Sequence, residues 1–261
     1  ATKGADGKVV TLRGGGVARV RPDGSDLEIY SYHTRNICDI AISPKLDLFT
    51  RDNTNDGKGW NIRVHHLTNG SEHGYPRLYK NFTDEAVKPI LDLGGGSGTG
   101  ALYLAEPGHD ELLLTCDWTT GKIYNDKVSE KGASYSLKES VYMNLPRAID
   151  IDVDGSGNLF VCDWRGGRFK FAGKGKKVGM VQKLTKKGLK GQPFPTLKGM
   201  STSELVSQLK SPSAVRRLEI QRVLLARAGT GSIKPLINFI KDSRLSLSLI
   251  HISEPTRPMN I

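Results

Sequence analysis

Cysteine is scarce in this chain, since its 261 residues include only Cys38, Cys116 and Cys162. Their spacing matches no metal-binding motif, and they form no disulfide framework. The sequence contains no Cys-x-x-Cys-His, so this stretch holds no c-type haem attachment. These absences exclude cysteine-based metal and haem sites. They do not show whether the protein works in an oxidising or a reducing compartment.

Long apolar segments and a leader sequence are missing as well. No run approaches the roughly 20 apolar residues of a transmembrane helix. The chain starts with "ATKGADGKVV", without an initiator Met or a signal-like segment, so we expect an interior start with targeting information elsewhere. The end, "LSLIHISEPTRPMNI" (247–261), resembles a peptide from sequencing-adapter read-through. We therefore expect residues 246–261 to be a non-native or disordered tail, and the chain to be a fragment.

Acidic residues become rare after residue 164. Residues 1–164 hold 18 Lys and Arg against 23 Asp and Glu, whereas residues 165–261 hold 20 against 4. The formal net charge of +11 thus belongs to the second part. This part includes the Lys-rich run "GKGKKVGMVQKLTKKGLKGQPFPTLKG" (173–199). Such a run could contact nucleic acid or an acidic surface. Its Pro, Gly and Lys content is more simply that of a solvated strand and a basic linker, which we place at residues 181–200, without a nucleic-acid partner.

The sequence repeats itself over a distance typical of β-propeller blades. "LLLTCDWTTGKIY" (112–124) aligns with "NLFVCDWRGGRFK" (158–170), and their cysteines are 46 residues apart. The segments "RNICDIAIS" (35–43) and "PRAIDIDVD" (146–154), which precede two of the copies, also match. A period of about 40–50 residues with alternating apolar residues predicts successive propeller blades.

A fainter third copy, "LDLFTRDN" (46–53), places Asp52 where the other two copies have Asp117 and Asp163. The Asp of each copy has two interpretations. It could accept hydrogen bonds from backbone N–H groups of the next turn, or it could line a site at the mouth of the central channel.

The stretch "DIDVDGSGNLFVCDWRGGRF" (150–169) begins like a calcium-binding EF-hand loop. An EF-hand requires a Glu at the twelfth position and helices on both sides. Here the twelfth position is Val161, and apolar residues alternate on both flanks. The stretch therefore predicts a β-hairpin with "DGSG" as its turn.

The glycine-rich stretch "PILDLGGGSGTGALYLAEPG" (89–108) resembles motif I of an S-adenosylmethionine methyltransferase, with Asp92, Gly94, Gly96 and Gly98 as the binding set. That motif needs a helix directly after Gly98, and Pro107 and Gly108 leave little room for one. In a propeller, the glycines would form an irregular loop before the strand "GALYLAEP". The methyltransferase is kept as an alternative.

The apolar period changes after residue 200. "STSELVSQLKSPSAVRRLEIQRVLLARA" has helical spacing, with Ser201 or Ser203 as the cap of a first helix and Pro212 near the start of a second. Two short helices joined by a tight turn are typical of a HEAT-type repeat, which cannot bury its own apolar face alone. We therefore expect an incomplete HEAT-like segment at residues 201–245.

The polar stretch "RDNTNDGKGWNIRVHHLTNGSEHGYPRLYKNF" (51–82) is the least blade-like part of the β region. Long loops in compact domains often carry function. Asp52, Asn53, Asn55 and Asp56 offer oxygen ligands for a hard cation, or they form an Asx-turn network that holds the insertion together. His65 and His66 alternate on a strand, so at most one of them faces a pocket.

Several of these motifs together resemble one protein family. "GGGVARVRPDGSDLEIYSYHTRNICDIAISPKLDLFTRDNTNDGKGWNIRVHH", "GGGSGTGALYLAEPG", "TCDWTTGKIY" and "LPRAIDIDVDGSGNLFVCDWRGG" are similar to large secreted proteins of planctomycetes and verrucomicrobia that are named membrane-bound dehydrogenases. Members combine a six-bladed propeller of the soluble glucose/sorbosone dehydrogenase type, HEAT-like helices and a haem-binding cytochrome c domain. The resemblance covers roughly residues 14–245.

The resemblance implies a function and a set of site residues. Relatives hold pyrroloquinoline quinone (PQQ) and calcium over the channel, with a His as base and an Arg that stabilises charge. "GWNIRVHH" offers His66 and Arg63 for these roles, and Asp52 completes the candidate catalytic set. The candidate residues for PQQ are Arg51, Asn53, Trp60 and Arg147, and those for calcium are Asn55 and Asp56.

We therefore predict a mainly β fold: a partial propeller of about four of six blades at residues 8–180, followed by the all-α HEAT-like segment. The predicted function is part of a periplasmic or extracellular quinoprotein that oxidises a sugar or alcohol and passes electrons to a cytochrome c domain outside this chain. The alternative is a non-catalytic propeller that binds carbohydrate or protein. Convergence of His66, Arg63 and Asp52 at a channel mouth would favour the enzyme, and their separation would favour the binding module.

Overall fold

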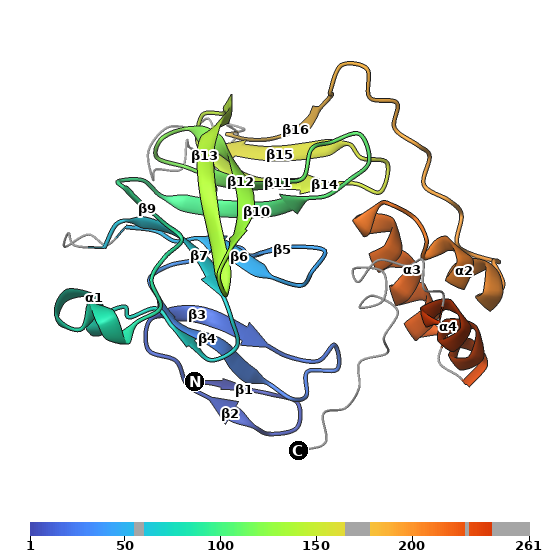
Figure 1. Ribbon diagram of the computed structural model, residues 1–261, viewed down its shortest axis with the longest axis horizontal. Helices are drawn as coiled ribbons and strands as arrows, with labels where there is room; N and C mark the ends of the chain where they lie inside the picture. The colour runs from blue at the N-terminus through green and yellow to red at the C-terminus, as the bar shows by residue number, and fades with distance from the viewer. Residues whose placement is uncertain (55–59, 165–177, 228–229, 242–261) are drawn as a thin grey trace.

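The chain folds into small, mostly antiparallel sheets that succeed one another, followed by a group of short helices (Figure 1). The computed structural model describes residues 1–54, 60–164, 178–227 and 230–241. The fold is mainly β, as predicted, and its sheets are arranged like consecutive blades of a partial propeller. Within the described ranges, no helix has the length and apolar content that crossing a membrane requires.

The N-terminal sheets are small. Strands β1 (Thr2–Lys3) and β2 (Val9–Val10) form a hairpin. Strands β3 (Gly15–Arg19) and β4 (Glu28–Thr34) pair antiparallel, and β8 (Ser71–Glu72) joins β4 in parallel. Helix α1 (Leu78–Asn81) and a 3-10 turn at Thr83–Glu85 follow β8.

The next three sheets carry the repeated motifs. The first contains β5 (Ala41–Ile42), β6 (Leu48–Arg51), β7 (Ile62–Leu67) and β9 (Leu91–Gly94). The second contains β10 (Gly98–Leu104), β11 (Leu112–Asp117), β12 (Lys122–Lys131) and β13 (Ser134–Asn144). The third contains β14 (Ala148–Val153), β15 (Leu159–Trp164) and β16 (Gly179–Leu184).

The three copies of the motif occupy equivalent places, which confirms the sequence alignment. Strands β6, β11 and β15 are each the second strand of their sheet and pair antiparallel with the strands on both sides. The segments that precede two of the copies contain β5 and β14, which are both first strands. The repeat therefore reflects three successive sheets.

The hairpin interpretation of the stretch at residues 150–169 is confirmed up to Trp164, because the residues after it lie outside the described part. Strands β14 and β15 pair antiparallel across a turn. Asp154 Oδ1 accepts the backbone N–H groups of Ser156 and Asn158, both at 2.9 Å, so it closes the turn and is no EF-hand ligand.

The methyltransferase alternative is wrong. Motif I requires a helix after Gly98, but strand β10 begins at that residue and pairs with β11. The segment "GALYLA" is apolar on both faces because it is the inner strand of a sheet covered on both sides. The glycines before it form the loop that enters the sheet, as the propeller interpretation predicts.

The first strands of the three sheets lie against one another. Ala101 on β10 donates its N–H to Asp39 Oδ2, next to β5, at 3.0 Å, and Thr99 Oγ1 donates to the Ala148 carbonyl on β14 at 3.0 Å. Buried apolar side chains fill the space between the sheets of β10 and β14, including Leu104, Leu114, Ile123, Ile151 and Val161. A second cluster around Phe49, Val64 and Leu113 joins the sheets of β5 and β10.

The long hairpin of β12 and β13 extends beyond its own sheet and covers the neighbouring one (Figure 1). Tyr135 donates a hydrogen bond to Asp47 Oδ2 at 2.6 Å and packs against Phe49. The hairpin therefore ties two sheets together.

Three helices form the C-terminal segment: α2 (Thr202–Gln208), α3 (Ala214–Ala226) and α4 (Ile233–Ile240), with a 3-10 turn at Thr230–Ser232 before α4. Ser201 and Glu204 form the capping box of α2, so Ser201 is the cap and Ser203, the other candidate, is not. Ser213 caps α3, so Pro212 lies just outside the helix. The three helices share one hydrophobic core, which includes Leu205, Leu209, Ile220, Leu224 and Phe239.

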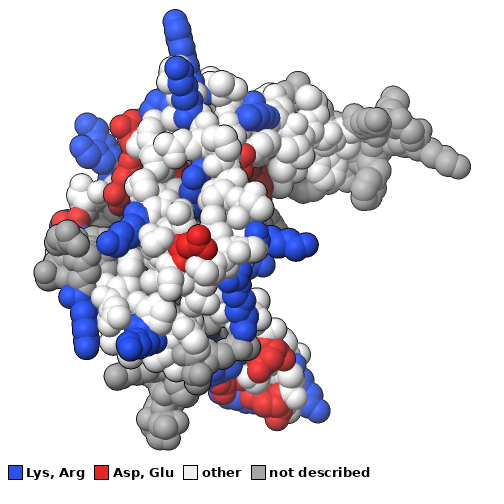
Figure 2. All heavy atoms as spheres, turned by 90° about the vertical axis from the view of Figure 1, so that its right-hand side faces the viewer, with Lys and Arg blue, Asp and Glu red and all other residues white. Residues whose placement is uncertain are grey.

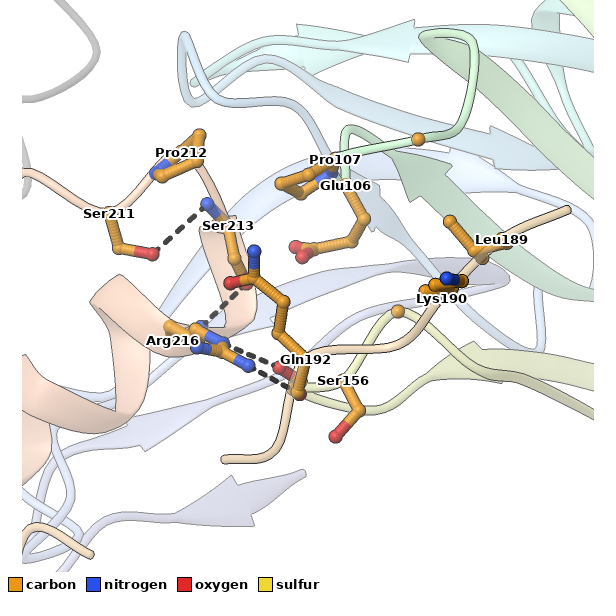
Figure 3. A pocket seen from close by; sticks show the side chains of 13 residues that line it. Glu106, Pro107, Ser156, Leu189, Lys190, Gln192, Ser211, Pro212, Ser213 and Arg216 are labelled. Atoms are coloured by element: carbon orange, nitrogen blue, oxygen red, sulfur yellow. Dashed lines mark hydrogen bonds between the residues drawn. The ribbon is translucent and has the colours of Figure 1, made fainter. Parts of the chain in front are cut away.

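The helices dock on the turns that join first and second strands. Glu106, after β10, accepts the N–H of Val215 in the first turn of α3 at 3.0 Å. Arg216 donates to the Gly155 carbonyl at 2.7 Å and to the Gln192 carbonyl at 2.6 Å. These contacts surround a pocket of about 220 Å³ (Figure 3). Figure 2 shows Lys and Arg side chains spread over this side of the molecule, in keeping with the basic second part of the chain.

Candidate functional site

In two of the three copies, the recurring Asp has a structural role. Asp117 Oδ1 accepts backbone N–H groups from Ser97, Thr119 and Thr120 at 2.9–3.1 Å. Asp52 in the same way accepts the N–H groups of three residues at 2.8 Å: Arg35, Asn36 and Asn53. Both carboxylates are fully buried, so the chain segments that they bind are fixed relative to the strands. The predicted hydrogen bonds to the next turn are confirmed for Asp117, which binds Thr119 and Thr120, whereas Asp52 binds Arg35 and Asn36 in the segment before β5.

Asp52 also belongs to a buried polar group. Trp60 Nε1 donates to Asp52 Oδ2 at 3.2 Å, and His65 Nε2 lies 3.7 Å from the same oxygen. Burial alone raises the pKa of Asp52, but His65 and the N–H groups of Arg35 and Asn36 outweigh it, so the pKa lies below its usual value. Asp52 is therefore an ionised anchor.

His65 also contacts a second buried histidine, His73. Their ring centres are 4.5 Å apart, and His73 Nε2 lies 3.0 Å from Ser71 Oγ. Burial, together with the nearby His65, lowers the pKa of His73 to about 3, so it is neutral at physiological pH. The side chains of this group are all buried.

A pocket of about 490 Å³ opens between the loops that Asp52 and Asp117 hold. Four chain segments contribute: the one before β5, the one after β6, the glycine loop that leads into β10, and the turn after β11. We call it the loop pocket, and its lining consists of Arg35, Asn36, Cys38, Asn53, Thr54, Gly96, Ser97, Gly98, Thr99, Trp118 and Thr119.

The lining combines a flat aromatic ring with polar and cationic groups. The Arg147 guanidinium stacks at 4.0 Å from the centre of the Trp118 ring. Asn53 Nδ2 donates to Ser97 Oγ at 3.1 Å, which joins two walls of the pocket. Burial, followed by the charges of Asp39 and Asp52, raises the pKa of the Cys38 thiol, so this thiol is not activated as a nucleophile.

The helices and the loop pocket lie at opposite ends of the same strands. Gly98, at the start of β10, lines the loop pocket, whereas Glu106, just past its end, contacts α3. The helical segment therefore leaves the loop pocket uncovered.

The structure does not bring the three predicted catalytic residues together. Asp52 is sealed beneath the loops, and Arg63 stacks at 3.9 Å from the centre of the Trp60 ring with Asp92 at 3.3 Å. His66 points to the other face of β7, where it contacts Asp47 at 3.4 Å and Ser134 at 3.1 Å. Arg63 and Asp52 share a neighbour in Trp60, while His66 belongs to the interface with the β12–β13 hairpin.

The predicted cofactor residues are divided in the same way. Asn53 lines the loop pocket and Arg147 stacks on its Trp118 wall. Trp60 is buried under the loops, and Arg51 is buried between two sheets, where it donates to Glu139 at 2.6 Å.

The predicted calcium ligands Asn55 and Asp56 lie outside the described residues. Among the residues that the structure does describe, no three His, Cys, Asp or Glu side chains are grouped as a metal site requires.

Sequence reasoning missed most of the pocket lining. Arg35 lies far from Ser97 and Thr99 in the chain, and they meet only because neighbouring sheets place their entry loops side by side. Trp118 could have been found from the sequence, because it directly follows the repeated Asp and therefore lies in the turn next to it.

Comparison with known proteins bears on the fold. The sequence matches no family model and no curated protein. An oxidoreductase (glucose dehydrogenase) of Thermus thermophilus is similar in structure, with a TM-score of 0.50 and 18% identity over 60% of this chain and 47% of that chain. The PQQ-bound aldose sugar dehydrogenase of Streptomyces coelicolor gives a TM-score of 0.50 and 16% identity over 64% and 51%.

This chain thus spans about half the length of the structures that it matches. At such low identity the likeness shows a shared fold. It confirms the predicted glucose-dehydrogenase-like, propeller-like fold and leaves the activity to be argued from the site.

Proposed function

We propose that this chain is part of an exported quinoprotein-like dehydrogenase that oxidises a sugar or an alcohol. The observation that carries the proposal is the loop pocket, a polar cavity with an aromatic wall in a fold shared with two sugar dehydrogenases. Because the chain spans about half of those structures, the complete site would include residues outside it.

The lining of the loop pocket fits PQQ, a planar quinone with three carboxylates. Trp118 offers a flat ring on which such a ligand stacks, and Arg35 in the lining supplies positive charge for its carboxylates. Arg147, which stacks on Trp118 and is not part of the lining, adds to that charge. Asn53 adds an amide that both donates and accepts hydrogen bonds. No step is assigned to calcium, because its predicted ligands Asn55 and Asp56 lie outside the described residues.

When bound, PQQ supplies the acceptor for the hydride that leaves the substrate carbon. The chain's own residues position the ligand. Arg35 and Asn53 hold its polar edge, and Trp118 fixes the plane of its rings. Asp52 and Asp117 keep the surrounding loops in place through their backbone hydrogen bonds, so the pocket is formed before the ligand arrives.

The domain organisation is part of the same proposal. Residues 8–180 form the propeller-like domain, residues 181–200 the basic linker and residues 201–245 a HEAT-like segment. The capped, mutually packed helices α2, α3 and α4 support the last assignment. A cytochrome c domain elsewhere in the protein would receive the electrons, in the periplasm or outside the cell.

The test is turnover by the full-length protein. PQQ and calcium are added to the protein purified without cofactor, and the reduction of an electron-accepting dye is followed with a panel of sugars and alcohols. We expect reduction that depends on both PQQ and one substrate class. An absence of spectral change and of dye reduction across the panel would rule out the dehydrogenase.

The same assay tests His66 as the base, which stays a prediction. Loss of turnover in His66→Ala, with an unchanged unfolding midpoint, would support that role, and unchanged turnover would refute it. The contacts of His66 with Asp47 and Ser134 favour the second outcome.

A non-catalytic binding module is the second candidate. The specific observation in its favour is that His66, Arg63 and Asp52 do not converge on one pocket. In that case the loop pocket would bind a carbohydrate or a protein segment, and ligand binding would be measurable without any dye reduction.

A further inference from the structure

Arg51 connects two neighbouring sheets. It is the last residue of β6, and its side chain is almost fully buried against the sheet of β10–β13. Its Nη1 atom donates to Glu139 Oε2 at 2.6 Å, and its Nε atom lies 3.5 Å from Asp117 Oδ2. Its guanidinium also stacks at 4.4 Å from the ring centre of Tyr124. One cation therefore serves carboxylates on two strands, β11 and β13.

Asp126 on β12 is the least compensated carboxyl group of this cluster. It pairs directly with Glu139 in the strand register, so the two side chains share one face of the sheet. Asp126 is fully buried, and neither of its oxygens has a hydrogen-bond partner among the described residues. Burial and the charge of Glu139 raise the pKa of Asp126 to about 7, although Arg51 acts in the opposite direction.

Two charged groups act on Asp126: Glu139 on β13, which pairs with it, and Arg51 on β6. Arg51 in turn contacts Glu139, Asp117 on β11 and the ring of Tyr124 on β12. Arg51 is permanently charged. Ionisation of Asp126 therefore adds a buried negative charge that competes with the other carboxylates for one guanidinium.

The cluster is also connected to the loop pocket. Asp117 contacts Arg51 with one oxygen and accepts the N–H groups of Ser97, Thr119 and Thr120 with the other. Ser97 and Thr119 line the loop pocket. A change in the partners of Arg51 therefore reaches the pocket wall through a single side chain.

We propose that the Arg51 cluster is a pH-sensitive coupling between the two sheets and the loop pocket. Ionisation of Asp126 draws the Arg51 guanidinium toward β12 and β13 and away from Asp117, whose contact with it is already the longer one. Asp117 is then left without its cation in a buried position, and its hold on the loops at Ser97 and Thr119 weakens. The proposal needs no bound PQQ and stands apart from the proposed activity.

The sign of the pH effect follows from the direction of the pKa change. The pKa of Asp126 is near 3.8 in the unfolded chain and about 7 in the folded protein. Between these values the folded protein holds a proton that the unfolded chain has lost. This contribution to stability is therefore lost as the pH rises from about 4 to about 7, and above that range the destabilisation is complete.

The experiment compares the wild type with Asp126→Asn, which keeps the shape and removes the ionisation. Urea unfolding is measured from pH 5 to pH 8, together with amide hydrogen exchange at Ser97, Thr119 and Thr120. One titrating proton raises the wild-type unfolding equilibrium constant by up to about tenfold per pH unit, and the variant lacks this rise. Protection at the three amides should fall with pH in the wild type, after correction for intrinsic exchange, and stay level in the variant. Asp84→Asn is the matched control, because the Asp84 side chain is 90% exposed, and it should behave like the wild type.

Identical pH profiles of stability for the wild type and Asp126→Asn would overturn the proposal. A difference in stability without any difference in exchange at the three amides would overturn the coupling to the pocket. If the variant does not fold, the Asp126 carboxyl is titrated by NMR in the wild type. A titration midpoint below 5 would then contradict the proposal, and a midpoint near 7 with a parallel change in amide exchange would support it.

Discussion

At the scale of single residues, buried carboxylates organise the loops of this protein. Asp52 and Asp117 each accept three backbone N–H groups at the end of a second strand. Their recurrence in the sequence indicated this role as one of two interpretations, because an Asp that follows an apolar strand and precedes a turn has such N–H groups within reach. The neighbours of these Asp residues, rather than the Asp residues themselves, line the loop pocket.

Replacement of Asp117 by Ala should destabilise the protein strongly. The substitution leaves the N–H groups of Ser97, Thr119 and Thr120 without their acceptor and removes one partner of Arg51. Removal of one partner from a buried ion pair costs about 3–5 kcal/mol, so we expect the free energy of unfolding to fall by more than about 2 kcal/mol.

Urea unfolding measures this change. Asp23→Ala is the control, since Asp23 caps an exposed turn at Ser25 and its loss should cost less than about 1 kcal/mol. Equal effects of the two substitutions would contradict the role of Asp117.

The histidine pair shows where residue-level prediction ends. Alternation along a strand predicted that His65 and His66 point to opposite faces, and they do so. Alternation could not tell that one face meets Asp52 and the other meets Asp47, because these contacts depend on which sheets become neighbours.

At the scale of elements, the strands with clear alternation were predictable. Strands β11, β14 and β15 coincide with the repeated apolar pattern. The stretch 51–82 was interpreted as a long loop, yet it contains β7, β8 and α1. Strand β7 is rich in Arg and His, so its pattern looks polar, and its place is set by pairing with β6. The sheet tolerates the polar side chains of β7 because each of them has an acidic partner: Asp92 for Arg63, Asp52 for His65 and Asp47 for His66.

The close approach of β10 and β14 gives a prediction at this scale. A Cβ atom added at Gly100 would lie 2.6 Å from Asp150 Cα and 2.9 Å from the Ile149 carbonyl oxygen. Backbone atoms cannot move aside like the end of a side chain, so Gly100→Ala should force the two inner strands apart. We expect a loss of more than about 2 kcal/mol in the free energy of unfolding.

Gly95→Ala is the matched control, because a Cβ atom there meets nothing within 4 Å. Thermal and urea unfolding of the two variants should differ clearly. If Gly100→Ala is as stable as Gly95→Ala, then β10 and β14 are not packed as described.

The helices could be located from the sequence, but their docking could not. The cap of α2 follows from Ser201 and Glu204, which are local. The contact of Glu106 with Val215 spans 109 residues, and nothing in the local pattern of either segment indicates it.

At the scale of the whole molecule, the candidate site forms where the loops of successive sheets meet. Four segments that are distant in sequence line the loop pocket, because the entry loops and second turns of neighbouring sheets gather at one end of the strands. The sequence therefore predicted the fold through its repeat, and predicted only Asn53 and Arg147 of the residues at the pocket. Other lining residues, such as Gly96, Gly98 and Trp118, lie in motifs of the sequence, but they become neighbours only through the fold.

The central claim is that the loop pocket holds a planar, anionic quinone, and binding of PQQ to the full-length protein tests it most directly. Isothermal titration calorimetry should give saturable binding that Arg35→Ala weakens by about tenfold or more, since a hydrogen bond to a charged group contributes about 1.5–3 kcal/mol. Arg19→Ala, at a surface ion pair with Glu28, should bind like the wild type. Absence of saturable binding, or equal affinity in Arg35→Ala and the wild type, would contradict the claim.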